Sequence, residues 1–207
     1  FCSNLQKMTK KERAKIVMTE LEKIYPEVPI PLNHKNAYEL LVAVALSAQT
    51  TDKKVNEVTP KLFSVAPNPQ KMAALEEPEI KELIKEIGLS TTKAKNLKLM
   101  ANQLLERHNG EVPANFEDLE NLAGVGHKTA SVVMSQAFGF PAFPVDTHIH
   151  RLMKQWKLTE GKNVVQTEND AKKLFPKETW NKLHLQIIFY GREYSPARGN
   201  QERDYIT

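Results

Sequence analysis

The sequence predicts an all-α protein with two lobes, and three observations support this. Apolar residues recur at helical spacing along almost the whole chain, and no convincing pair of strands is present. The net charge is +2 over residues 1–28, −1 over 29–140 and +3 over 141–207. This split suggests one lobe built from both termini and another from the middle. A cleft between two such lobes is a common place for a site.

Ten helices are expected, each from its own run of apolar positions. In the first, Ile16, Val17, Leu21 and Ile24 lie at helical spacing. The second is apolar nearly all round, which is typical of a buried central helix. The expected ranges are 10–25, 37–48, 50–63, 78–87, 91–108, 115–123, 127–138, 147–156, 167–175 and 179–190.

Proline, glycine and asparagine separate these helices. Pro60 lies inside the third helix and should kink or split it, because proline has no amide proton to donate. Pro67–Pro69, Gly88, Asn109–Gly110 and Gly139–Pro141 fall where turns and helix ends are needed. The short connections indicate a compact bundle.

Composition excludes several classes of protein. The 207 residues contain no apolar run approaching 18 residues and no signal-peptide pattern at the start, so we expect an intracellular protein without a membrane contact. Cys2 is the only cysteine, which rules out an internal disulfide and a thiolate metal site. The net charge of +4 weakly favours a polyanionic partner.

The segment LAGVGHKTASVV contains two glycines one residue apart, followed by a lysine and an apolar helix. Asn115 can cap the preceding short helix, Gly124 can end it with a positive φ, and Gly126 lets the next helix begin at once. The first amides of that helix would point outward at the positive end of its dipole, which suits a phosphate. The alternative is a plain helical hairpin whose glycines serve only the turn.

LAGVGHKTA resembles the helix-hairpin-helix element of the endonuclease III family of DNA glycosylases, usually L-P-G-V-G-R-K-T-A. Ala123 and His127 depart from that form. Further stretches match the family in its order: LLVAVALSAQTTD, IGLSTTKA, HNGEVP and VDTHIHR. The resemblance covers about residues 10 to 195.

The resemblance implies a two-lobed helix-hairpin-helix DNA glycosylase fold. A six-helix domain would span 29–140, and a discontinuous helical domain would combine 1–28 with 141–207. It also implies an enzyme that removes oxidised pyrimidines from double-stranded DNA in base excision repair and then nicks the abasic site. We expect it to act as a monomer, in the cytoplasm or nucleoid if the source is bacterial.

Lys128 matches the family's catalytic lysine, which forms a Schiff base with C1′ of the sugar. A lysine with a pKa of about 10.4 needs about 4–5 kcal/mol to lose its proton at pH 7. The dipole of the following helix and a partly desolvated cleft would both lower that cost. The alternative is a surface cation that meets a phosphate.

Asp146 matches the family's catalytic aspartate. It would stabilise positive charge on the sugar or accept a proton. It also precedes an apolar-periodic run, so it is a good candidate for a helix N-cap. The two roles are compatible.

The resemblance assigns DNA binding to further residues. Gln49 and Leu89 match positions that enter the duplex, although Gln49 could instead cap a helix and Leu89 could lie in the core. His148 matches a position near DNA, and it does not share a helix face with His150, which argues against a metal site. The hairpin residues expected to contact DNA are Gly124, Val125, Gly126, His127 and Thr129.

One departure concerns a cofactor. Most members of the family hold a [4Fe–4S] cluster with four cysteines near the C-terminus. Here Ser195 stands where the first would fall, and no cysteine follows it. Such clusters require thiolates, so we expect none here. Tyr190, Tyr194 and Pro196 would then pin the C-terminal segment.

Two other functions remain open. The chain could be a monofunctional adenine or mismatch-thymine glycosylase of the same superfamily, although these commonly lack the lysine at position 128. It could also be a non-catalytic hairpin module that only holds DNA. Borohydride trapping of a covalent DNA adduct separates both from the bifunctional enzyme.

Overall fold

The computed structural model describes residues 8–194, which form helices and no strand, as expected for the all-α class. The chain divides into two compact units. We call Ile30–Gly139 the central unit, and residues 8–29 with 140–194 the terminal unit. In the described residues, no helix is long and apolar enough to cross a membrane.

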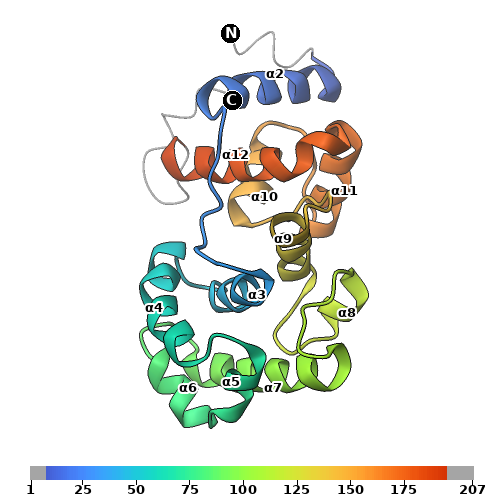
Figure 1. Cartoon of the computed structure of the whole chain (residues 1–207). Coiled ribbons are helices and arrows are strands. Elements are labelled where there is room, and N and C mark those ends of the chain that lie inside the picture. The colour runs from blue at the N-terminus through green and yellow to red at the C-terminus, as the bar shows by residue number, and fades with distance from the viewer. Residues whose placement is uncertain (1–7, 195–207) are drawn as a thin grey trace. The chain divides into compact units, whose positions relative to one another are not determined.

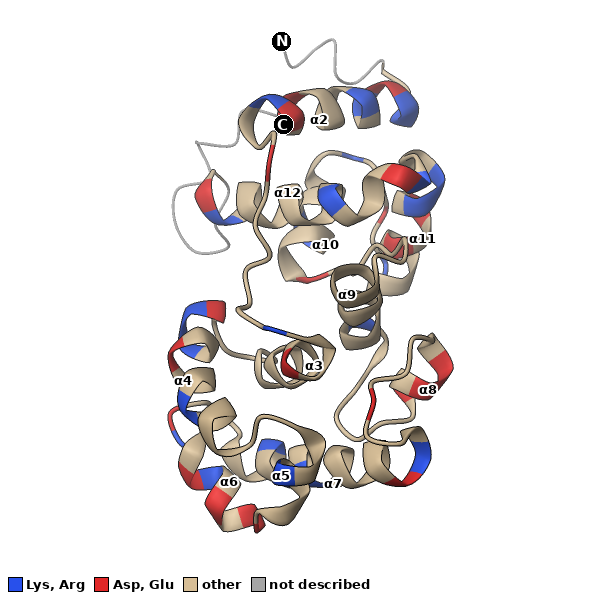
Figure 2. Cartoon of the chain, viewed as in Figure 1, with Lys and Arg blue, Asp and Glu red and all other residues tan. Residues whose placement is uncertain are grey.

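Helix α3 (Ala37–Leu46) lies in the core of the central unit (Figure 1). Asn36 begins it by accepting a hydrogen bond from the amide of Glu39. Its only charged residue is Glu39, so in Figure 2 the helix is tan apart from one red segment. Because nearly every position is apolar, α3 can be covered from several sides, and it packs against α4 (Asp52–Val65), α7 (Ser90–His108) and α9 (His127–Phe138).

Pro60 does not split the third helix, because α4 runs through it as one helix of 14 residues; the alternative, that it kinks the helix, stays a prediction. Pro60 is exposed and removes one amide donor from the helix. Val55, Val58 and Leu62 are buried on both sides of it. Packing on either side of the proline therefore holds the helix together.

The central unit has seven helices in the described chain, where the resemblance implied six. The additional one, α5 (Pro69–Ala74), lies where the sequence was interpreted as a turn. Asn68 caps it by accepting from the amide of Lys71, and Pro69 occupies its first turn. This Asn-Pro pair is a helix-start signal. Both α5 and α6 (Glu77–Leu83) pack against α7.

The terminal unit has its own core. Helix α12 (Trp180–Glu193) contacts α2 (Lys10–Ile24) and α10 (Thr147–Gln155), and α11 (Val164–Leu174) packs on α2 and α10 (Figure 1). A short 3₁₀ helix, Lys177–Thr179, leads into α12. The largest fully buried side chains of this unit are those of Leu21, Phe143 and Tyr190.

Aromatic rings secure the end of α12. Tyr190 lies 5.2 Å from Tyr194 and 5.7 Å from Trp156 between ring centroids. Tyr25 donates a hydrogen bond to Glu193. Tyr190 and Tyr194, two of the residues expected to pin the C-terminal segment, thus pack on each other at the end of the described chain. Ser195 and Pro196, which belong to the same expectation, lie outside the described residues, as does Cys2.

Candidate functional site

The glycine-containing hairpin joins α8 (Phe116–Glu120) to α9. Asn115 caps α8 as expected, by accepting from the amide of Asp118 at 2.8 Å. Gly124 has φ +75°, where a residue with a side chain is strained. Gly126 is extended and is the N-cap of α9, so this helix begins without a side-chain hydrogen bond at its cap. Its first amides are therefore not occupied by a capping side chain.

Helix α7 braces this turn from the side. The amide of Ala123 donates to Oε1 of Gln103 at 2.7 Å. A Cβ atom built on Gly124 would lie 3.2 Å from Cβ of Asn96. A side chain at position 124 would thus be strained and also crowded.

The hairpin residues expected to contact DNA differ in exposure. Gly126, His127 and Lys128 are exposed, and Thr129 is half-buried. Val125 is buried in the core of the central unit. Only the backbone of Val125 can therefore be presented to a ligand.

His127 stands in the position where the family usually has arginine. Its Nδ1 lies 2.8 Å from Oε1 of Glu120, and its ring stacks on that of Phe116 at a centroid distance of 5.7 Å. Its carbonyl accepts from the hydroxyl of Ser131. The imidazole thus links α8 to the first turn of α9, next to Lys128.

Lys128 lies in the first turn of α9, one residue after His127. The side chain is exposed, so the partial desolvation expected from the sequence is not provided by the described residues.

Asp146 is the N-cap of α10. Its Oδ1 accepts from the amide of Ile149 at 2.8 Å, so the N-cap prediction is confirmed. This bond uses one carboxylate oxygen, and the residue is only half-buried. A carboxylate fixed in this way can also take part in chemistry.

The negative charge of Asp146 also acts on His184, a buried residue of α12 that the sequence did not single out. Nδ1 of His184 lies 2.9 Å from the carbonyl of Trp180, and Nε2 has no hydrogen-bond partner among the described residues. Burial lowers the pKa of His184 from 6.5 to about 4, against smaller opposing effects of the Trp180 carbonyl and Asp146. The imidazole is therefore neutral at pH 7.

His148 and His150 contact different parts of the terminal unit. Nδ1 of His148 lies 3.0 Å from a guanidinium nitrogen of Arg151, and a Cβ built on Gly191 would lie 3.0 Å from Cβ of His148. Nδ1 of His150 lies 2.8 Å from the hydroxyl of Thr167. The two rings are held apart by these separate contacts.

Gln49 and Leu89 have the same unusual backbone conformation. Their φ angles are 59° and 61°, in the left-handed region that few residues with side chains adopt. Leu89 is 57% exposed, which excludes the core alternative for this residue. Gln49 is exposed and follows the C-cap of α3, which is Ser47, so Gln49 is not that cap.

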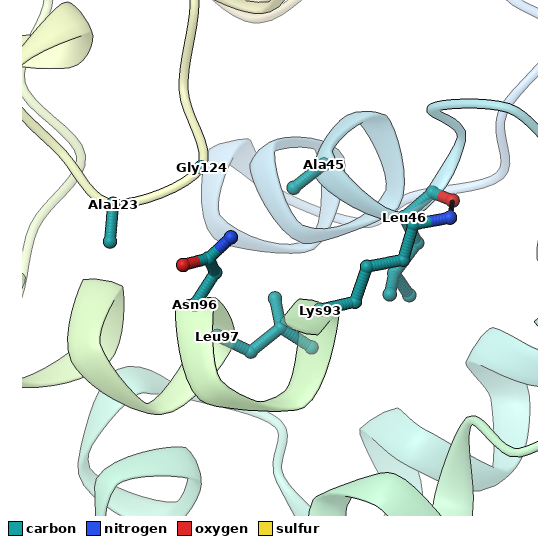
Figure 3. A pocket seen from close by; sticks show the side chains of 7 residues that line it. All are labelled: Ala45, Leu46, Lys93, Asn96, Leu97, Ala123 and Gly124. Atoms are coloured by element: carbon teal, nitrogen blue, oxygen red, sulfur yellow. Dashed lines mark hydrogen bonds between the residues drawn. The ribbon is translucent and has the colours of Figure 1, made fainter. Parts of the chain in front are cut away.

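A buried lysine in the same region was missed by sequence reasoning. Lys93 of α7 is 7% exposed, and its Nζ donates to the carbonyls of Leu46 at 3.0 Å and Ala48 at 2.6 Å. Figure 3 shows its side chain reaching the end of α3, beside a pocket of about 30 Å³ that Asn96 and Gly124 also line. Burial lowers the pKa of Lys93. Its place in IGLSTTKA gave no signal of burial.

Comparison with known proteins agrees with this architecture. Residues 42–177 match the family described as HhH-GPD superfamily base excision DNA repair protein. Endonuclease III of Haemophilus influenzae is 45% identical over 92% of this chain and 90% of its own length. Endonuclease III of Escherichia coli K12 is 44% identical over the same shares.

A solved structure agrees as well. The one described as "Structure of a Trapped Endonuclease III-DNA Covalent Intermediate: Estranged-Adenine Complex" matches with a TM-score of 0.90 and 39% identity, over 94% of this chain and 92% of that chain. The chain therefore belongs to the endonuclease III family, within the HhH-GPD superfamily of base excision DNA repair proteins.

Proposed function

We propose that this protein is a bifunctional DNA glycosylase and abasic-site lyase that removes oxidised pyrimidines from double-stranded DNA. The observation that carries the proposal is Lys128, an exposed amine at the start of α9, directly after the hairpin turn. The similar protein trapped as a covalent intermediate with DNA requires a nucleophile of this kind.

The amine of Lys128 must be neutral to attack. Bound DNA would exclude water from this exposed side chain, and removing water from an ammonium favours its neutral form. We therefore propose that substrate binding completes the activation of Lys128.

The reaction begins when the damaged nucleotide leaves the stack, since C1′ is not accessible inside the duplex. The Lys128 amine forms a bond to C1′ as the bond to the damaged base breaks. The base leaves with the electrons of that bond and takes up a proton. The amine loses a proton and O4′ of the sugar gains one as the ring opens, which gives a protonated imine. Loss of a 2′ proton then expels the 3′ phosphate by β-elimination, and water releases the lysine.

Asp146 supports these steps as an ionised carboxylate. It stabilises positive charge that develops on the sugar and accepts a proton from the attacking amine. Its bond to the amide of Ile149 fixes the direction of the carboxylate. His148 contacts DNA from the same helix, at the position that matches the family.

Gln49 and Leu89 enter the duplex and fill the space that the flipped nucleotide leaves. The exposed apolar side chain of Leu89 has the chemistry of a wedge between bases. The hairpin holds a phosphate at the start of α9, which has no capping side chain. The phosphate contacts come from the backbone of Gly124, Val125 and Gly126 and from the residues His127 and Thr129.

We also propose that the protein functions without an iron–sulfur cluster. The residues present do not fit one, because the chain has a single cysteine and a cluster needs four thiolates. The stacked rings of Tyr190 and Tyr194 and the bond from Tyr25 to Glu193 hold the end of α12 instead. The protein acts as a monomer in the compartment that holds the DNA.

The test is incubation with a duplex that contains thymine glycol opposite adenine, with and without borohydride. We expect strand nicking, and a covalent adduct when borohydride is present. Base release without nicking or adduct would instead indicate a monofunctional glycosylase. DNA binding without base release would indicate a non-catalytic module.

A further inference from the structure

Three side chains on one face of α7 hold backbone segments of the central unit. Lys93, Asn96 and Gln103 lie at helical positions i, i+3 and i+10, which share a face. Lys93 binds the segment after α3, Asn96 packs against the glycine of the hairpin, and Gln103 accepts from the hairpin amide of Ala123. Within the central unit, helix α7 thus contacts both the loop that contains Gln49 and the hairpin that directly precedes Lys128 in α9.

Lys93 is held by backbone oxygens. Its ammonium donates to the carbonyls of Leu46 and Ala48, and no carboxylate of the described residues forms a salt bridge with it. These carbonyls lie at the C-terminal end of α3, where the helix dipole favours a cation. An apolar side chain at position 93 would leave these oxygens without their donor.

Lys93 lies close in the structure to both residues expected to enter DNA. Its side chain binds the carbonyl of Ala48, which directly precedes Gln49, and its backbone makes the ordinary helical hydrogen bond to the carbonyl of Leu89, the N-cap of α7. Gln49 and Leu89 are both left-handed, a conformation that persists in such residues only where the surroundings fix it. The buried side chain therefore ties the loop of Gln49 to the start of α7, which directly follows Leu89.

We propose that Lys93 is a positioning residue that sets the spacing of Gln49 and Leu89 for entry into the duplex. This inference rests on the proposed function, because it assumes that these two residues enter DNA. Lys93 itself does not touch the substrate. It acts through the backbone of the two loops.

The chain offers a matched control on the same helix. Nζ of Lys98 donates to the carbonyls of Leu75 at 2.6 Å and Ala73 at 3.4 Å. These carbonyls belong to the end of α5 and its C-cap, and not to the loops of Gln49 or Leu89. The variants Lys93→Met and Lys98→Met each remove one lysine that binds two backbone carbonyls.

Both variants are compared with the wild type on two substrates. The first is a duplex with thymine glycol beside 2-aminopurine, whose fluorescence rises when the bases unstack. The second is a single-stranded abasic oligonucleotide trapped with borohydride, which has no opposite strand for Gln49 or Leu89 to enter. Thermal unfolding of each variant is recorded alongside.

We expect Lys93→Met to lower the fluorescence change and the turnover on the duplex by about tenfold to a hundredfold, since small displacements of positioning groups have effects of this size. Trapping on the single strand should stay within about twofold, because the hairpin and Lys128 remain in place. Lys98→Met should leave the ratio of duplex to single-strand activity unchanged. If Lys93→Met does not fold, Lys93→Gln, which keeps a shorter donor, should lower the same ratio less.

The inference is overturned if a folded Lys93 variant keeps the wild-type ratio, or if both activities fall together. It is also overturned if Gln49→Ala with Leu89→Ala leaves the duplex fluorescence unchanged, because nothing would then need positioning. A wild-type protein that traps neither substrate would contradict the proposed function itself, which is a separate outcome.

Discussion

The starts of α9 and α10 have nearly the same backbone and opposite chemistry. The N-cap of α9 is Gly126, with φ −95° and ψ −176°, and that of α10 is Asp146, with φ −96° and ψ −175°. Asp146 accepts a hydrogen bond from the first turn of its helix, whereas Gly126 has no side chain to do so. The start of α9 thus has no capping side chain, and the start of α10 fixes a carboxylate.

The difference shows how one local structure can serve two demands. The positive end of a helix dipole disfavours an ammonium and favours a carboxylate. The two helix starts carry different side chains: an amine follows the glycine at the start of α9, and a carboxylate caps α10. A nucleophile and its acidic partner are side chains of these two kinds.

The largest expected effect comes from removing the amine. Lys128→Gln should lower borohydride trapping and nicking by about a thousandfold or more, because no other group replaces a covalent nucleophile. Lys128→Arg should lose as much activity while it keeps DNA affinity within about threefold, since a guanidinium retains the charge but not the nucleophile. Quantified adduct formation and a binding titration at one salt concentration measure both. An active Lys128→Arg variant would show that the residue only meets a phosphate.

The second effect separates the two roles of Asp146. Asp146→Asn should reduce turnover by about a hundredfold to ten-thousandfold, the range for a lost acid or base. Its stability should stay near that of the wild type, because asparagine caps helices as well as aspartate does. Asp146→Ala should lose the activity and also about 1 kcal/mol of stability. Single-turnover rates and urea unfolding test this, and an unchanged rate in Asp146→Asn would leave only the capping role.

A pH titration probes the surroundings of Asp146. The buried imidazole of His184 has its pKa lowered from 6.5 to about 4, so between these values only the unfolded chain binds the proton. Above pH 6.5 the contribution of His184 to stability is complete. As the pH falls from 6.5 towards 4, the free energy of unfolding should decrease by about 3 kcal/mol in total, because the unfolded chain binds the proton and the folded protein does not.

His184→Gln keeps a polar side chain without a titration near neutral pH, so it is the matched variant. The difference in unfolding free energy between pH 7 and pH 4.5 should be smaller in this variant than in the wild type. Urea unfolding at the two pH values measures it. Equal losses in both proteins would mean that His184 does not remain neutral in the folded state.

The smallest effect is expected from a variant that gives α9 a capping side chain, as α10 has. Gly126→Ser supplies the cap that α9 lacks, and a Cβ at position 126 meets nothing within 4 Å. Stability should rise by a few tenths of a kcal/mol. DNA affinity should fall severalfold, because the serine hydroxyl would accept a hydrogen bond from an amide that we propose binds phosphate. Gly124→Ala is the contrasting variant, since its positive φ and the nearby Asn96 should make it less stable by about 1 kcal/mol or more. Tighter DNA binding by Gly126→Ser would contradict this account of the hairpin.

Much of the hairpin could be predicted because its signals are local. The range 127–138 expected for the helix after the glycines is the one observed for α9, and Asn115 and Asp146 cap the helices that follow them. Turn glycines and capping side chains act within a few residues, so a single sequence reveals them.

Features that depend on distant residues were not predicted. Lys93 is buried because α7 packs beside the end of α3, whose Leu46 lies 47 residues away in the chain. A lysine in a helix otherwise indicates an exposed residue, so the burial of Lys93 could not be predicted from its position in the sequence. The burial of His184 and the continuity of α4 through Pro60 likewise depend on packing in the cores of the two units.

The most direct test of the central claim is peptide mapping of the borohydride-reduced adduct between the wild-type protein and abasic DNA. If the start of α9 presents the reactive amine, digestion and mass spectrometry should find the sugar fragment on Lys128. An adduct confined to any other amine, or no adduct in a preparation that binds and nicks the DNA, would contradict the account.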